Sequence, residues 1–206
     1  MAYPVVIHAA VEGLVDEAVA RRLVEAAGAS AGDAHGRNGK AWLHQKLRAY
    51  NEAARHGPWL ILVDLDQDAE CAPPLRRQWL PNAAPRMCFR IAVHAVEAWL
   101  MADAESLASF LRVPAARIPA DPERILNPKE EVVKLARQSR LAAIREDMVP
   151  REGSGRPIGP AYASRLIEFV SHRWRPEVAA KRSESLKRAI ERLTELVCRM
   201  REEGLS

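Results

Sequence analysis

The pattern of apolar and polar positions is most informative at residues 59–63, where five apolar residues follow one another without a polar interruption. Such a run is typical of a strand that is buried on both faces of a parallel sheet. It ends at an acidic segment that carries Asp64, Asp66 and Asp68. Because open α/β sheets bind ligands beyond the carboxyl ends of their strands, the pattern places these carboxylates where a ligand would bind.

Other segments give the remaining elements. Residues 5–11 form a second apolar run that predicts a strand, and helical spacing then begins at Leu14 and ends at Gly28. A weak strand is expected within residues 29–39 and a further strand over 87–96, whereas the proline-containing segment 71–80 is predicted to be a broken loop. Spacing, caps and prolines predict further helices over residues 41–55, 96–103, 104–111, 128–137, 161–174, 176–181 and 185–202.

The order of these elements predicts an α/β fold, with a mostly parallel, Rossmann-like sheet flanked by helices and a helical C-terminal extension. We expect the α/β core to span residues 1–112. Prolines become frequent beyond Val113, and residues 113–206 are predicted to form a helical region that packs on the core. Within it the last helix is amphipathic, so it is expected to pack back on the sheet. Phosphate contacts by its basic residues are the second interpretation, and the helix could also serve a homodimer. Asp103 and Asn127 are predicted to cap the helices that follow them.

Composition narrows the class of protein. The chain has 206 residues, of which 48% are hydrophobic, and its formal net charge of +4 permits a polyanionic partner without requiring one. Its three cysteines are widely spaced and form no CxxC pair, which argues against a zinc ribbon or a disulfide framework. The sequence contains neither an N-terminal targeting segment nor an apolar run of membrane-spanning length. We therefore expect a cytoplasmic protein with no membrane partner.

Carboxylates are predicted to gather at the carboxyl edge of the sheet. Asp64 and Asp66 are two residues apart, so they project to the same side if the strand continues that far. Glu12 follows the first strand, and Glu97 follows a later one. Two hard oxygen ligands on one side suit Mg²⁺ or Mn²⁺, ions that would also balance the charge of a phosphate. The alternative is that Asp64 caps the helix that follows it and that Asp66 and Asp68 are solvated loop charges. Taken alone, Glu12 is more simply interpreted as a first-turn charge favoured by the helix dipole.

Two basic segments are candidates for binding phosphate or nucleic acid. Residues 36–40 form a glycine-rich loop that carries Arg37 and Lys40 ahead of a helix, whose N-terminus favours anions. The spacing does not match a P-loop, and an ordinary loop is the interpretation we favour. Arg76 and Arg77 lie near a tryptophan, an arrangement that would contact the backbone and bases of a nucleic acid. A solvated loop with one packed tryptophan is the interpretation we favour here too.

The acidic motifs resemble those of a known family. Residues 11–16, Val-Glu-Gly-Leu-Val-Asp, are similar to the Glu-Gly-x-x-Asp turn of the Toprim domain, and Asp-Leu-Asp at 64–66 is similar to its DxD motif. In order and spacing, residues 5–103 thus resemble the Toprim domain of topoisomerases, primases and overcoming-lysogenisation-defect nucleases. A narrower likeness, to an uncharacterised group of bacterial Toprim-like proteins, rests on residues 12–13, 64–68, 97–103, 174–177 and 183–186.

The resemblance implies functions for individual residues. Glu12 would be a metal ligand or a general acid or base, Asp64 and Asp66 would hold Mg²⁺, and Asp68 would be an auxiliary ligand. Glu97 and His94 are candidates for a second ion or for protonation of the leaving group. The glycine often found after the family's DxD segment is absent here, as are a topoisomerase tyrosine context and a primase zinc module.

Strand passage and primer synthesis are therefore not expected. We expect metal-dependent hydrolysis of phosphodiester bonds in a nucleic acid, the activity of a nuclease. A binding or regulatory module without catalysis, working beside a partner protein such as a defence-system ATPase, is the alternative, because the chain has no nucleotide-hydrolysing motif of its own. A haloacid-dehalogenase-like phosphatase and a DxD-type glycosyltransferase are lesser alternatives.

Overall fold

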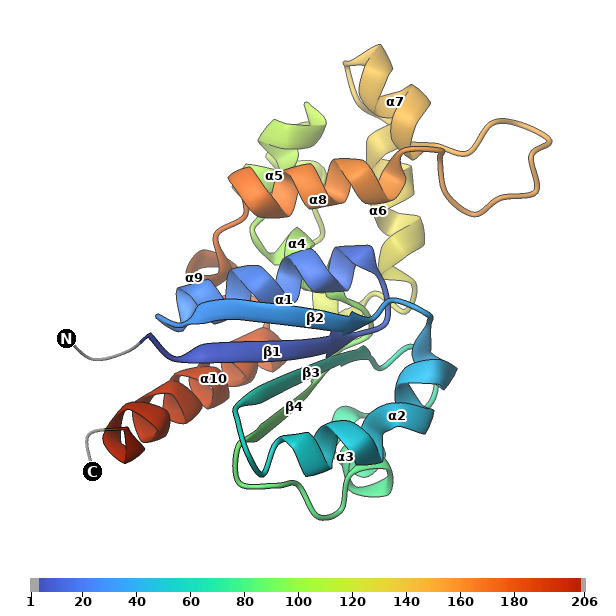
Figure 1. Cartoon of the computed structure of the whole chain (residues 1–206). Helices are drawn as coiled ribbons and strands as arrows, with labels where there is room; N and C mark the ends of the chain where they lie inside the picture. Colours follow the sequence, from blue (N-terminus) through green and yellow to red (C-terminus); the bar gives the residue numbers. More distant parts are fainter. Residues whose placement is uncertain (1–3, 205–206) are drawn as a thin grey trace.

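The computed structural model describes residues 4–204 and shows a single sheet of four parallel strands (Figure 1). The strand order is β2-β1-β3-β4, and every neighbouring pair is parallel. The predicted α/β architecture with a parallel sheet is confirmed. The strands are β1 (Val6–Val11), β2 (Ser30–Gly36), β3 (Trp59–Asp64) and β4 (Met87–Ala92).

Helices cover both faces of the sheet. In Figure 1, α2 and α3 lie on one face, whereas α1 lies on the other with α8 stacked on its outer side. None of the helices within residues 4–204 combines the length and the apolar character that a membrane span requires. The helices are α1 (Leu14–Ala26), α2 (Lys40–Ala53), α3 (Ala72–Trp79), α4 (Val96–Ala102), α5 (Ala104–Leu111), α6 (Pro128–Arg137), α7 (Ala142–Met148), α8 (Tyr162–His172), α9 (Pro176–Ala179) and α10 (Glu184–Glu203), with short 3-10 helices at Ala115–Arg117 and Pro122–Arg124.

The apolar run of β3 is explained by its central position. Leu60 and Leu62 pack on the α1 side, while Ile61 and Val63 pack on the α2 side, and all four side chains are fully buried. Because alternate residues of a strand face opposite sides, a strand covered on both faces needs apolar residues at every position. β2 is an edge strand with mostly exposed or half-buried residues, which explains its weak sequence signal.

Three predictions of local structure were incomplete or wrong. The segment predicted to be a broken loop over residues 71–80 contains α3, whose prolines lie in the first turn, where a missing backbone N–H costs no helical hydrogen bond. The strand predicted over 87–96 ends at Ala92. Helix α7 was not predicted.

The C-terminal region adds to the main core. The predicted packing of the last helix is confirmed, because its buried stripe, including Leu186, Ala189 and Leu193, joins the core on the side of β4. The predicted cap of α6 is also confirmed: the Asn127 side chain accepts a hydrogen bond from the backbone N–H of Glu130.

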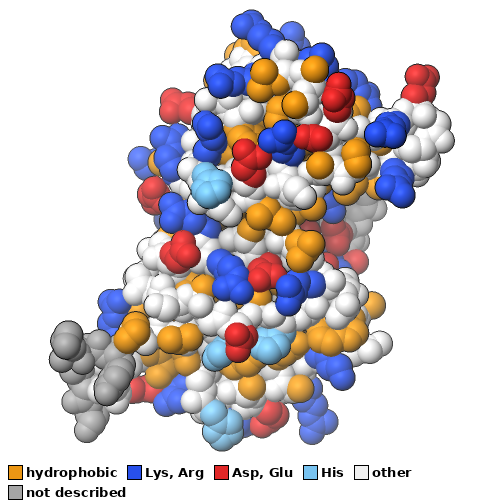
Figure 2. Space-filling view, turned by 45° about the horizontal axis from the view of Figure 1, so that its top comes forward, with side chains coloured by type: hydrophobic (Ala, Val, Ile, Leu, Met, Phe, Trp, Pro, Cys, Tyr) orange, Lys and Arg blue, Asp and Glu red, His pale blue; other side chains and the backbone are white. Residues whose placement is uncertain are grey.

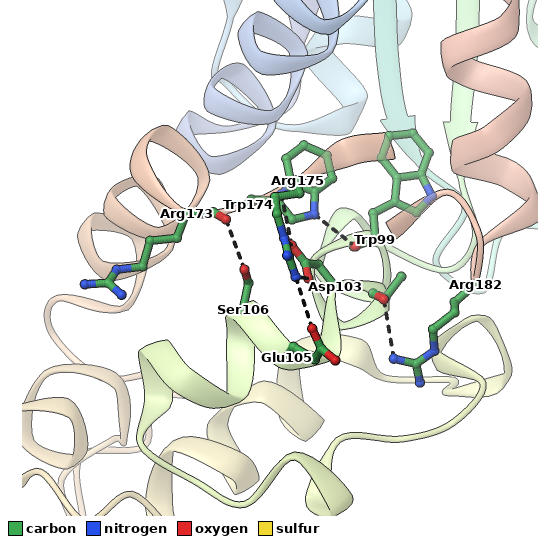
Figure 3. A network of polar contacts seen from close by, with 9 residues as sticks. Trp99, Asp103, Glu105, Ser106, Arg173, Trp174, Arg175 and Arg182 are labelled. Atoms are coloured by element: carbon green, nitrogen blue, oxygen red, sulfur yellow. Dashed lines mark hydrogen bonds and ion pairs between the residues drawn. The ribbon is translucent and has the colours of Figure 1, made fainter. Parts of the chain in front are cut away.

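An ion pair between the buried Asp103 and the partly exposed Arg175 fastens the start of α9 to the α4–α5 junction (Figure 3). The Asp103 carboxylate, which is fully buried, accepts hydrogen bonds from Nε and Nη2 of Arg175 at 3.0 and 2.7 Å and from its backbone N–H at 3.0 Å. Beside it, the indole N–H of Trp174 donates to the carbonyl of Trp99. Within the described chain, the Asp103 carboxylate does not accept the expected capping hydrogen bond from a backbone N–H of α5, because it accepts from Arg175 instead.

The strand order creates a topological switch point between β1 and β3. From β1 the chain continues to β2, which forms one edge of the sheet, whereas from β3 it continues to β4, which forms the opposite edge. Helices α1 and α3, which follow these two neighbouring strands, lie on opposite faces. The crevice beyond the carboxyl ends of two such strands is where ligands of open α/β sheets bind.

The end of β2 approaches β1 so closely that only glycine fits. Gly36 has a φ of +97°, and a Cβ atom added there would lie 2.2 Å from the carbonyl oxygen of Val11. We expect Gly36→Ala to lower the free energy of unfolding by at least about 2 kcal/mol, from the strained backbone and the clash together. Urea denaturation measures this change.

Gly153→Ala is the matched control, since Gly153 also has a positive φ, +73°, but has no atom within 4 Å of the added Cβ. It should cost about 1 kcal/mol, from the left-handed backbone alone. Equal effects of the two substitutions would contradict the close approach at Gly36.

Candidate functional site

Glu12 and Asp64 meet at the switch point. Glu12 follows β1, and one of its carboxylate oxygens accepts a hydrogen bond of 2.9 Å from the backbone N–H of Asp64, the last residue of β3. The Asp64 carboxylate in turn accepts a 2.9 Å hydrogen bond from the N–H of Val96, the first residue of α4. These two bonds tie together the ends of β1 and β3 and the start of α4. Asp64 does not cap the helix that follows it in the chain, α3, whose N-cap position is Cys71; its carboxylate accepts from the first N–H of α4 instead.

Two further carboxylates are buried at the same edge. Asp16, in the first turn of α1, is 8% exposed, and Glu97, in the first turn of α4, is 2% exposed. Glu97 Oε1 accepts a hydrogen bond from the Tyr162 hydroxyl at 3.2 Å and lies 3.9 Å from Nζ of Lys129. Asp16 Oδ1 and Glu97 Oε2 are buried without a hydrogen-bond partner among the residues described. Buried polar atoms are nearly always paired, so two such oxygens at one edge need a reason.

The electrostatics of the four carboxylates are unfavourable. Burial raises the pKa of Glu12 to about 7, against the opposing effects of the Asp64 N–H and the Lys40 ammonium. Burial and the nearby charge of Glu97 raise the pKa of Asp16 to about 6, and burial together with the neighbouring carboxylates raises the pKa of Asp64 well above its usual value. Repelling charges in a poorly solvated place favour protonation or a bound cation.

Two lysines supply positive charge at this edge. The negative charge of Glu97, and then those of Asp64 and Asp16, raise the pKa of Lys129 despite its partial burial. The Lys40 ammonium lies 2.8 Å from a carboxylate oxygen of Asp66 and 2.6 Å from one of Asp68. Lys40 therefore bridges the two acidic residues that follow β3.

The acidic residues predicted from the sequence divide into two groups. Glu12, Asp64 and Glu97 lie together at the switch point, joined by hydrogen bonds or by their mutual electrostatic effect. The extended backbone does not continue to Asp66, which has a φ of +49°, so strand alternation does not bring its carboxylate beside that of Asp64. Asp66 and Asp68 instead turn to Lys40.

The predicted phosphate-binding residues are dispersed. Arg37 pairs with Glu17 at 3.3 Å, and Lys40 pairs with the acidic residues after β3. Arg76 and Arg77 are exposed in the last turn of α3, on the opposite side of the sheet from α1. Figure 2 likewise shows Lys and Arg side chains spread over the visible face among acidic ones, without one continuous basic stripe.

Sequence reasoning missed three contributors to this site. Asp16 was quoted only as part of the Glu-Gly-x-x-Asp motif, although that motif is the signal that would have found it. Lys129 and Tyr162 come from α6 and α8, far along the chain from the strand ends. No local pattern marks either residue, because their importance comes only from tertiary packing against Glu97.

The donor set fits a hard divalent cation. Carboxylate oxygens are the ligands that Mg²⁺ and Mn²⁺ prefer, and the unpartnered oxygens of Asp16 and Glu97 are free to bind one. The carboxylates nevertheless stand apart: within residues 4–204, the only group of three acidic, histidine or cysteine side chains with ligand atoms all within 4.8 Å of one another is His8, Asp33 and His35. Binding one ion at the switch point would require the carboxylates to turn toward one another.

Comparisons of the chain with protein-family models, with curated proteins and with solved structures found no match. The site is therefore interpreted from its own geometry and chemistry.

The buried charge of Asp16 predicts a pH-dependent stability in the presence of EDTA. Because its folded-state pKa is raised, Asp16 favours the folded state below its usual pKa of about 4, and this contribution is lost as the pH rises through about 6. Asp16→Asn should therefore leave stability unchanged near pH 4 and increase the free energy of unfolding at pH 8 by about 1 to 3 kcal/mol. Urea denaturation at the two pH values tests this expectation.

Glu25→Gln is the control, because Glu25 is an exposed acidic residue on the same helix. It should change stability by less than about 0.5 kcal/mol at either pH. A loss of stability in Asp16→Asn of the same size at pH 4 and pH 8 would show that the carboxylate is not under electrostatic strain.

Proposed function

We propose that this protein is a Mg²⁺- or Mn²⁺-dependent, Toprim-like enzyme that acts on phosphodiester bonds, a nuclease. The observation that carries the proposal is the meeting of Glu12 and Asp64 at the switch point, beside two buried carboxylates that each have an unpartnered oxygen. Ligand binding at the carboxyl edge of such sheets and the affinity of hard cations for carboxylates support it.

The residues at the carboxyl edge of the sheet would have different functions in the reaction. Asp64, Asp16 and Glu97 would hold the cation, and a divalent ion there would neutralise phosphate charge and polarise an attacking water molecule. Glu12 is less deeply buried than these three, so it is the carboxylate suited to take a proton from that water. Tyr162 fixes one oxygen of Glu97 and thereby leaves the other directed to the cation.

Residues after β3 would complete the site. Asp66 and Asp68 become available as ligands when Lys40 leaves them, and the released ammonium would meet a substrate phosphate. His94 lies at the same edge, where its Nδ1 is 3.1 Å from the carbonyl oxygen of Asp66. In its protonated form it would donate a proton from Nε2 to a leaving oxygen, because Nδ1–H faces that carbonyl. A nucleic acid is the proposed substrate, with the exposed Arg76 and Arg77 as further contacts to its backbone.

Metal binding and turnover can be tested on the same samples. We expect Mg²⁺ or Mn²⁺ to raise the melting temperature relative to EDTA in the wild type and in the control Glu25→Gln, because an ion that binds only the folded state stabilises it. Asp64→Asn should lose this increase and should also lose metal-dependent cleavage of plasmid DNA or of RNA. The asparagine retains an oxygen that can accept the Val96 N–H, so the fold should persist by circular dichroism.

The outcomes separate the alternatives. Metal stabilisation and cleavage that both survive in Asp64→Asn would overturn the proposed site. An unchanged melting temperature in wild-type protein at millimolar metal would do the same.

A second candidate function is a binding or regulatory module without catalysis, acting with a partner protein. The observation that favours it is Lys40, whose ammonium already sits between Asp66 and Asp68 as a metal ion would. Metal stabilisation without cleavage of DNA or RNA would support this function. In that case Lys40→Met should strengthen the stabilisation by Mg²⁺, because it removes a competing positive charge.

A further inference from the structure

A second group of potential metal ligands lies away from the switch point, on the face of the sheet that α2 covers, beside the edge strand β2. The side chains of His8 on β1 and of Asp33 and His35 on β2 each offer one ligand atom, and these atoms all lie within 4.8 Å of one another. His8 is half-buried, and the other two are exposed. Two imidazoles and one carboxylate form a donor set quite different from the carboxylates at the switch point.

A bulge in β2 brings the three residues together. Ile7 pairs with Ala31 and Ala9 pairs with Ala34, so two residues of β2, Gly32 and Asp33, oppose the single residue His8. Bulges of this kind redirect side chains and are frequent beside functional sites. After the bulge His35 pairs with Ala10, which faces α2, and its side chain therefore lies on the same face as that of His8.

Gly32 makes room for the first histidine. A Cβ atom at this position would lie 3.0 Å from Nδ1 of His8 and 3.0 Å from a methyl group of Val6. A larger residue in the bulge would push the imidazole away from Asp33. The small residue therefore favours the approach of His8 to the two ligands on β2.

Trp59 forms a wall behind both imidazoles. Its ring centre is 5.4 Å from that of His8 and 5.3 Å from that of His35, and Tyr50 packs against it at 5.2 Å. Aromatic contacts of this kind restrict the rings of the two histidines. Both potential ligands are thus held against one rigid surface, which reduces the entropy that metal binding must overcome.

We propose that His8, Asp33 and His35 bind a transition-metal ion of the Zn²⁺, Ni²⁺ or Co²⁺ class. Imidazole nitrogen suits these ions, whereas Mg²⁺ takes oxygen ligands. Ligands of one Zn²⁺ lie about 3 to 3.5 Å apart, so the ligand atoms must approach by about 1 Å. The exposed Asp33 and His35 side chains can make this movement toward the half-buried His8. Solvent exposure leaves the remaining coordination positions to water or to a further ligand.

Binding has a small structural cost. The backbone N–H of Asp33 donates a 3.2 Å hydrogen bond to Nδ1 of His8. A metal ion bound at that nitrogen displaces this bond, and the N–H is then satisfied by water, because Asp33 is exposed. The ion links β2 to β1, so it should also stabilise the edge of the sheet.

The test is a Zn²⁺ titration by calorimetry on metal-stripped protein without a histidine tag. Cys71 and Cys198 carry exposed thiols that also bind Zn²⁺, so all variants are made in a Cys71→Ser/Cys198→Ser background. We expect one Zn²⁺ per chain, displaced by Co²⁺ or Ni²⁺ but not by Mg²⁺. His35→Ala should weaken binding by at least about tenfold, and His8→Ala should do the same.

His172→Ala is the matched control, since His172 is exposed at the end of α8 and lies outside the group. It should bind Zn²⁺ as the background protein does, and so should Asp64→Asn, which separates this site from the proposed magnesium site. Circular dichroism checks folding, and the exposed His35 decides the outcome if His8→Ala does not fold. Absence of Zn²⁺ binding, or binding that neither histidine variant weakens, would overturn the proposal.

Discussion

The structure depends on the burial of β3 between two helical layers. Its four central residues, 60–63, alternate between the α1 side and the α2 side, and each contributes a fully buried apolar side chain to one of the two cores. Such a strand has no position for a charge along its length. The first place where charge is tolerated is its carboxyl end, and Asp64 occupies it. The same constraint places Glu12 at the end of the neighbouring strand, β1.

Burying carboxylates at the carboxyl end of the sheet lowers the free energy of unfolding, and the surrounding hydrogen bonds and positive charges compensate for this loss only in part. Asp64 accepts one backbone hydrogen bond from α4, and Glu97 receives the Tyr162 hydroxyl and lies near Lys129. One oxygen of Asp16 and one of Glu97 remain without a donor in the part of the chain described. Asp103 is a useful contrast, because Arg175 satisfies both of its oxygens and that pair is fully explained by packing. This difference favours the switch point, rather than acidic residues in general, as the proposed place of function.

The features that were predicted correctly from the sequence are those that local patterns control. The apolar run of β3, the cap at Asn127 and the stripe of α10 each depend on neighbours within a few residues. The left-handed backbone conformation of Asp66 was not predicted, because an aspartate at the end of a strand is compatible with both extended and left-handed backbone. Nor was α3, since prolines look alike in a loop and in the first turn of a helix. Lys129 and Tyr162 reach the site only through tertiary contacts.

The two groups of potential ligands lie at different places along β1. One lies on the face of the strand that α2 covers, and the other lies at its carboxyl end. His8 and Ala10 of β1 face α2, while Val11 faces α1 and the strand ends at Glu12. Helix α2 covers β1 and β3 and reaches the β2 edge through Tyr50, whose ring centre is 6.1 Å from that of His35, while the His35 side chain stays exposed to water. At the carboxyl end, the first turns of α1 and α4 bury the carboxylates of Asp16 and Glu97. An open edge with nitrogen ligands selects borderline metal ions, and an enclosed edge with oxygen ligands selects hard ones. The two proposed metal sites are thus separated by only a few residues of a single strand, and each can be tested without disturbing the other.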